Sequence, residues 1–81
     1  MSLRDQIVAI FTEVAASQER TLAPLADGLD LMQAGLDSLC FAIIVARLED
    51  ELGLDPFSTS DEAHFPATFG GFVALYQTVS A

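Results

Sequence analysis

The sequence predicts a small all-α domain, because its apolar residues recur at helical spacing and no segment alternates like a β-strand. The 81 residues suffice for one domain, spanning 1–81. At this size only about 60% of the unfolded chain's surface is buried on folding, so the core is thin. We therefore expect a small four-helix bundle, made of three main helices and one short helix, with a long first loop.

The first helix is expected over about 2–17, followed by a long connection over about 18–37. Four apolar residues form one helical stripe in the first segment: Ile7, Ile10, Phe11 and Val14. The connection contains the helix breakers Pro24, Gly28 and Gly35. It also contains five large apolar residues: Leu22, Leu25, Leu29, Leu31 and Met32. A loop this apolar is expected to pack across the domain.

Two further helices and one short helical turn are predicted in the second half. The second helix should cover 38–52 and end at Gly53, a residue type common just after helices. A short helix is expected around 60–64. Thr68 should cap the last helix, which runs to about 79. Gly70 and Gly71 lower the helix propensity of this last helix, and close packing against another segment would explain why glycine occurs there.

The composition excludes several classes of function. Three arginines against twelve acidic residues give a net charge of −9, so nucleic acid and anionic membranes are not expected partners. Cys40 is the only cysteine, which rules out an internal disulfide and a cysteine-rich metal site. No metal site is predicted. The first five residues lack the pattern of a signal peptide, and the apolar run 39–46 is too short to span a bilayer. We expect a cytoplasmic, stand-alone monomer.

The segment Gly35-Leu36-Asp37-Ser38-Leu39 lies where the long loop meets the second helix. Asp37 suits the helix cap, so Ser38 falls in the first turn, and Leu39 is expected to point inward and fix the turn. Unpaired amides and partial positive charge at a helix N-terminus stabilise a phosphate. A hydrolase elbow would need glycine where Cys40 stands, so Ser38 is expected to be modified rather than to attack unaided. The chain is therefore not expected to be an enzyme.

The chain resembles the acyl and peptidyl carrier proteins. Asp37-Ser38-Leu39 follows Gly-Leu and opens a helix ending Leu-Glu-Asp-Glu-Leu-Gly, and the last helix begins after Pro-Ala-Thr. The resemblance implies that a phosphopantetheinyl transferase attaches phosphopantetheine from coenzyme A to Ser38, framed by Asp37 and Leu39. It also implies an acyl- or aminoacyl-loading ligase or synthase and a downstream transferase as partners. The cargo would be held as a thioester.

The second helix departs from the usual carrier pattern, since its outward face near Ser38 is apolar rather than acidic. We expect this face to dock a partner through Ala42, Ile43, Ala46, Arg47, Glu49 and Asp50. Alternatively, the long loop folds over it. The apolar face favours a peptidyl-type carrier, whereas Asp37 favours an acyl carrier, so the cargo class stays open. The alternative function is an unmodified helical adaptor that binds a partner through this face.

Overall fold

The computed structural model describes residues 2–54, 56 and 66–80, and within these ranges it contains three α-helices, one 3-10 turn and no strand. The helices are α1 (Leu3–Ser17), α2 (Ser38–Leu52) and α3 (Phe69–Ser80), and the turn η1 (Leu31–Gln33) lies in the connection between α1 and α2. The all-helical prediction is confirmed, and the bounds of the three main helices are confirmed to within one residue. The short helix expected at 60–64 lies outside the described residues.

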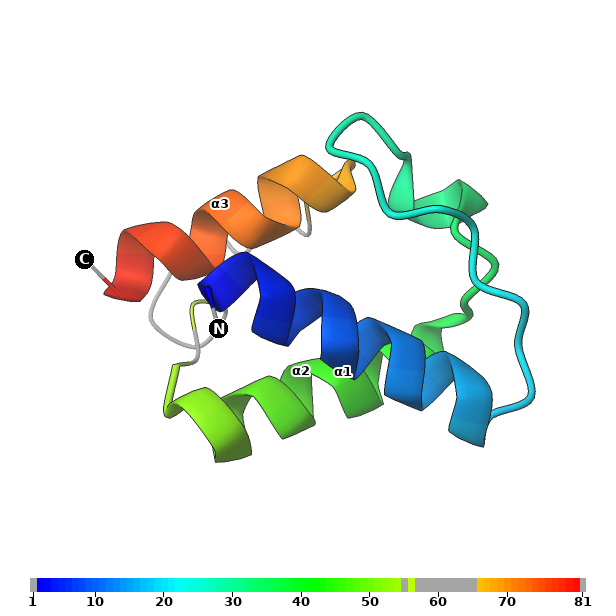
Figure 1. Cartoon of the computed structure of the whole chain (residues 1–81), viewed down its shortest axis with the longest axis horizontal. Coiled ribbons are helices and arrows are strands. Elements are labelled where there is room, and N and C mark those ends of the chain that lie inside the picture. The colour runs from blue at the N-terminus through cyan, green and yellow to red at the C-terminus, as the bar shows by residue number, and fades with distance from the viewer. Residues whose placement is uncertain (1, 55, 57–65, 81) are drawn as a thin grey trace.

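Helix α1 lies between the other two helices and packs against both (Figure 1). It begins where the Ser2 hydroxyl accepts a hydrogen bond from the Asp5 amide at 3.1 Å, as its N-cap. Its predicted stripe is buried in full, and Phe11 is at the centre of the core. The Phe11 ring meets the rings of Phe69 and Phe72 edge-on, each at 5.2 Å between centroids.

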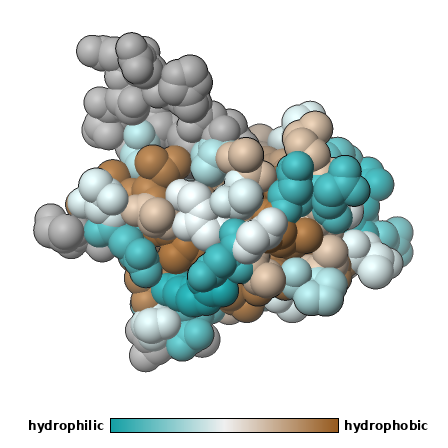
Figure 2. Space-filling view, turned by 90° about the horizontal axis from the view of Figure 1, so that it is seen from above, coloured by the Kyte–Doolittle hydropathy of each residue, from teal (hydrophilic) through white to brown (hydrophobic). Residues whose placement is uncertain are grey.

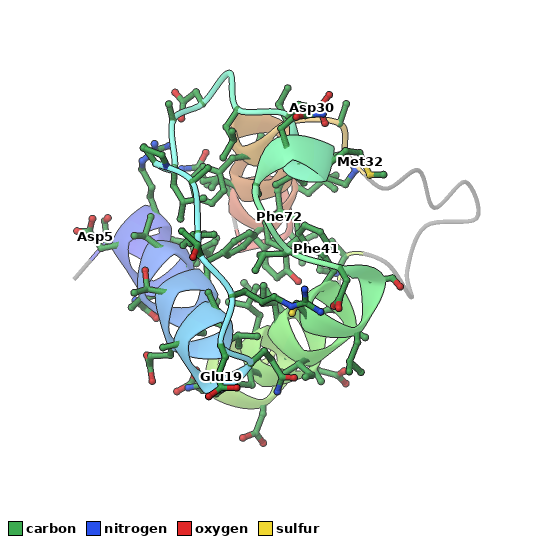
Figure 3. All side chains as sticks on the ribbon, turned by 90° about the vertical axis from the view of Figure 1, so that its right-hand side faces the viewer. Asp5, Glu19, Asp30, Met32, Phe41 and Phe72 are labelled. Carbon is green, nitrogen blue, oxygen red and sulfur yellow. The ribbon has the colours of Figure 1, made fainter. Side chains whose placement is uncertain are left out.

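Side chains from α2 and α3 complete this core. Figure 3 shows Phe41 and Phe72 directed into the space among the helices, whereas Asp5 and Glu19 point outward. On α2, the fully buried residues are Cys40, Ile44 and Leu48. Three further α2 residues are half-buried and pack against the cluster: Phe41, Val45 and Leu52. Cys40 is only 1% exposed and belongs to the core.

The long connection packs across the domain as predicted, and backbone hydrogen bonds tie it to the start of α3. The amides of Phe69 and Gly70 donate to the carbonyls of Leu29 and Asp27, both at 2.9 Å. A Cβ on Gly70 would lie 2.8 Å from the Asp27 carbonyl oxygen, so the close packing expected at this glycine is packing against the loop. Leu31 and Ala34 are buried, and most of the other apolar loop residues are half-buried.

Met32 is the exception, because 83% of its surface is exposed. The prediction that it packs inward is wrong. In the tight η1 turn Leu31 takes the inward position, and the next residue is consequently turned toward solvent.

The connection reaches α2 through one backbone conformation that requires glycine. Gly35 has a φ of 91°, and a Cβ at this position would lie 2.3 Å from the carbonyl oxygen of Thr21. An L-residue is therefore excluded by both strain and contact. This turn sets the direction in which the chain enters the next helix at Ser38.

Candidate functional site

The candidate site is the N-terminus of α2, where Asp37 is the N-cap and Ser38 is the first helical residue. Asp37 has extended backbone angles, and its Oδ1 accepts a hydrogen bond from the Cys40 amide at 2.9 Å. This capping arrangement is the one that the sequence predicts. It leaves the Ser38 side chain exposed at the helix tip.

The first two amides of α2 are open. Among the described residues, no acceptor meets the N–H of Ser38 or Leu39, as expected for the first turn of a helix. The start of α3 is different, because the Phe69 and Gly70 amides donate to the loop and the Gly71 amide donates to the Thr68 hydroxyl at 3.1 Å. The start of α2 therefore has donors to offer a ligand and the start of α3 does not, while at the start of α1 the Leu3 and Arg4 amides likewise meet no acceptor among the described residues.

The Asp37 carboxylate carries a charge that is already partnered. Hydrogen bonds from the backbone N–H and then the side chain of Cys40 hold the pKa of Asp37 below its usual value; desolvation opposes them, and the nearby charge of Arg20 adds a smaller lowering effect. Arg20 Nη2 lies 2.6 Å from Asp37 Oδ2. Both carboxylate oxygens are thus engaged, and Asp37 is not free to act as a base toward Ser38.

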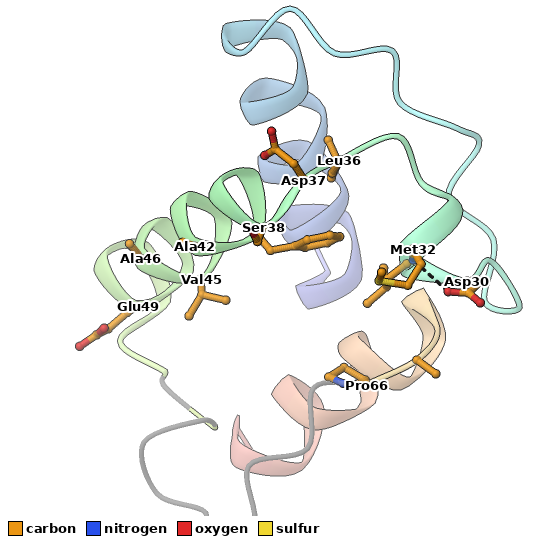
Figure 4. Close-up of a pocket in the computed structure, with 13 residues that line it drawn as sticks. Asp30, Met32, Leu36, Asp37, Ser38, Ala42, Val45, Ala46, Glu49 and Pro66 are labelled. Carbon is orange, nitrogen blue, oxygen red and sulfur yellow. Dashed lines mark hydrogen bonds between the residues drawn. The ribbon is translucent and has the colours of Figure 1, made fainter.

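Ser38 lies at one end of an apolar groove of about 1030 Å³ (Figure 4). One wall is the face of α2, and the opposite wall is formed by the loop and the segment before α3. The lining residues of the α2 wall are Ser38, Phe41, Ala42, Val45, Ala46 and Glu49. The opposite wall is formed by Asp30, Leu31, Met32, Pro66 and Ala67, and Leu36 and Asp37 line the end near Ser38.

The prediction that Leu39 points inward and fixes the first turn of α2 is wrong. Leu39 is 60% exposed and is not among the residues that line the groove. The next residue, Cys40, is rotated by about 100° around the helix and takes the inward position instead. Leu39 is therefore an exposed apolar residue beside Ser38.

The six expected docking residues do not form one surface. Ala42 and Ala46 are exposed and line the groove together with Glu49. Ile43 is half-buried and packs against the core, and Asp50 is exposed but outside the groove. Arg47 forms ion pairs with Glu13 of α1 at 3.2 Å and with Glu51 at 3.6 Å. The alternative in which the loop covers this face is wrong for Ala42 and Ala46, since the loop forms the opposite wall.

Two features of the site were missed by sequence reasoning. Arg20 lies 17 positions before Asp37, and no local pattern indicates that the two side chains meet. The apolar composition of the loop indicated that it packs, but the sequence gives no register that would place Met32 across from α2. On the face drawn in Figure 2, hydrophilic side chains are interspersed with small apolar patches.

Comparisons of the chain with protein-family models, with curated proteins and with solved structures found no match. Within the described ranges, every helix falls short of the length and apolar character needed to cross a bilayer. The same residues contain no cluster of three His, Cys, Asp or Glu side chains that could hold a metal ion.

Proposed function

We propose that the chain is a carrier protein whose Ser38 is modified with phosphopantetheine from coenzyme A. The observation that carries this proposal is the position of the Ser38 hydroxyl, which is exposed at the first residue of α2, beside two open amides and at the end of an apolar groove. The resemblance of residues 35–39 to the attachment segment of acyl and peptidyl carriers supports it. The proposal includes a short fourth helix, which would complete a four-helix bundle of the carrier type.

The residues around Ser38 fit a phosphodiester. The N–H groups of Ser38 and Leu39 can donate to phosphate oxygens, and the partial positive charge of the helix N-terminus favours the anion. The adjacent Asp37 carboxylate would repel a phosphate, but its charge is offset by Arg20. No residue of the described chain has to move to make room, because the hydroxyl is already exposed.

Attachment would use the serine oxygen as the acceptor of a group transfer. Ser38 Oγ would form a bond to the phosphorus that bears the pantetheine, while the bond from that phosphorus to the adenosine bisphosphate portion of coenzyme A breaks. The hydroxyl proton would pass to a base on the transferase, since the carboxylate next to Ser38 is engaged by Cys40 and Arg20. The transferase would also supply the Mg²⁺ for this step.

The attached group supplies a terminal thiol that holds an acyl or aminoacyl cargo as a thioester. The chain itself would contribute tethering, which raises the effective concentration of the cargo in a partner's active site to about millimolar. This role requires no catalysis by the carrier. A loading ligase or synthase and a downstream transferase would be the partners, in the cytoplasm.

The exposed alanines of α2 are the best candidates for partner docking. Ala42 and Ala46 present a small apolar surface on the α2 wall of the groove, with Glu49 as its acidic rim. All three arginines of the chain are in ion pairs with its own acids, so the unpartnered surface charge is negative. A partner with a basic rim around a small apolar site would be complementary.

Mass spectrometry after incubation with coenzyme A, Mg²⁺ and a promiscuous phosphopantetheinyl transferase tests the proposal. We expect the wild-type chain to gain the mass of one phosphopantetheine and Ser38→Ala to gain nothing. A Ser58→Ala control should be modified like the wild type. If the wild-type chain stays unmodified, the carrier function is refuted, and the unmodified adaptor becomes the better interpretation.

A further inference from the structure

The groove that begins at Ser38 has at its other end the carboxylate of Glu49, which no cation among the described residues contacts. Ser38 and Glu49 both line it, and they are separated by about three helical turns, or ~16 Å along the helix axis. Eleven residues at 100° each bring Glu49 back to within about 20° of the direction of Ser38. Figure 4 shows the two side chains on one side of α2, with Ala42, Val45 and Ala46 between them.

We propose that the cargo is an aminoacyl group, held so that the arm on Ser38 lies along this groove and the cargo ammonium pairs with Glu49. This inference rests on the proposed function. From phosphorus to sulfur the arm has about 13 bonds of ~1.5 Å, which gives roughly 16 Å for an extended zigzag. A fully extended arm therefore places its thioester beside Glu49, and an amino group on the carbon next to the carbonyl is within reach of the flexible carboxylate.

On the α2 wall of the groove, the charges favour a cation at the Glu49 end rather than at the Ser38 end. Asp37, near Ser38, is paired with Arg20, and Asp30, on the opposite wall, accepts the Met32 amide at 2.9 Å. Glu49 is exposed, and no cation among the described residues contacts its carboxylate. Arg47 is only two residues away but is directed to Glu13 and Glu51. Glu49 is thus the carboxylate on the α2 wall that is open to a positive group, among the described residues.

The packing beneath the groove disfavours the other class of cargo, a long acyl chain inserted into the core. The Phe41 ring lies against Phe11 at 6.2 Å between centroids, and Ile44 and Leu48 behind it are fully buried. An acyl chain could enter only by displacing these side chains, and close-packed cores resist such displacement. A short cargo held in the groove requires no such change.

The test compares two cargoes that differ in the amino group. The ¹⁵N-labelled protein is loaded at Ser38 from stable amide analogues of coenzyme A that carry either an alanyl or a propanoyl group. We expect both cargoes to shift the amide resonances of Ala42 and Ala46, and only the alanyl cargo to shift that of Glu49. Nuclear Overhauser contacts from the alanyl methyl group to Ala46 should accompany this shift.

Variants of two acids on the same helix separate the pairing from a general charge effect. Glu49→Gln should abolish the alanyl-specific shift and lower the docked fraction by about two- to fivefold, as for an exposed ion pair. Glu51→Gln removes the same charge from the side of α2 that faces Arg47, so the alanyl-specific shift should persist.

Three outcomes overturn the inference. Identical spectra for the two cargoes would refute the pairing with Glu49. Shifts centred on Ile44 and Leu48 would place the cargo in the core instead of the groove. An alanyl-specific shift that survives in Glu49→Gln would assign the ammonium to another group. In each case the arm has been attached, so the carrier function stands; failure to attach it at all refutes that function first.

Discussion

Arg20 and Asp37 are joined by an ion pair with 2.6 Å between Nη2 and Oδ2, although they lie 17 positions apart. The pair connects the beginning of the long loop to the N-cap of α2, the helix that carries Ser38. The other carboxylate oxygen of Asp37 holds the Cys40 amide. A single side chain therefore caps the helix and anchors the loop, which fixes the position of the candidate attachment site.

The charge on Asp37 should stabilise the fold in a pH-dependent way. Because the pKa is lowered in the folded state, the unfolded state binds more protons between the two pKa values, and stability rises with pH there. The contribution is present above the unfolded value near 3.8 and is lost as the pH falls through the folded value. Asp37→Asn keeps a good cap but removes the charge.

Urea unfolding of the wild type and of Asp37→Asn from pH 7 down to pH 2 measures this difference. We expect the wild type to be more stable at pH 7, with the two unfolding midpoints converging as the pH falls below 3.8. Arg20→Gln leaves the Asp37 cap in place, so at neutral pH it should lose less stability than Asp37→Asn does. A difference in unfolding midpoint between wild type and Asp37→Asn that stays constant at all pH values would contradict the role of the charge.

Gly35 should tolerate no side chain. At a φ of 91°, with the Thr21 carbonyl oxygen 2.3 Å from the added Cβ, Gly35→Ala should lower the free energy of unfolding by about 1–3 kcal/mol. Gly28→Ala is the matched control, because nothing lies within 4 Å of its Cβ. That change should be neutral or stabilise by up to about 1 kcal/mol. Thermal unfolding compares them, and equal melting temperatures for both variants would show that the turn at Gly35 adapts.

The docking role of the exposed α2 face can be tested at Ala46. Ala46→Glu should lower kcat/KM for arm attachment by about tenfold, or ~1.4 kcal/mol, because it places a charge in the apolar part of the interface. Ala74→Glu on α3 makes the same substitution at another exposed helical position. It should leave kcat/KM within about twofold of wild type, since it lies on a different helix. Ile43 is less suitable, because it packs against the core and a charge there would also destabilise the fold.

Circular dichroism of both glutamate variants confirms that the helices are retained. If Ala46→Glu and Ala74→Glu are modified at the same rate, the face of α2 that lines the groove does not dock the transferase.

The sequence by itself determined the three main helices and the position of Ser38 at the start of the second. These features depend on local properties: apolar spacing, a side-chain cap at Asp37, and a glycine after Leu52 that adopts the left-handed conformation. Such properties act within one or two helical turns, so they can be read along the chain. The sequence also predicted that the loop packs against the domain, because its leucines needed to be buried.

Only the tertiary structure decided what surrounds Ser38. The groove, the Arg20–Asp37 ion pair and the exposure of Leu39 all depend on how the 18–37 connection crosses the domain. That path is fixed by its hydrogen bonds to α3 and by the turn at Gly35, which join residues distant in sequence. Local preferences assign no energy to such contacts, since they exist only after the helices have packed.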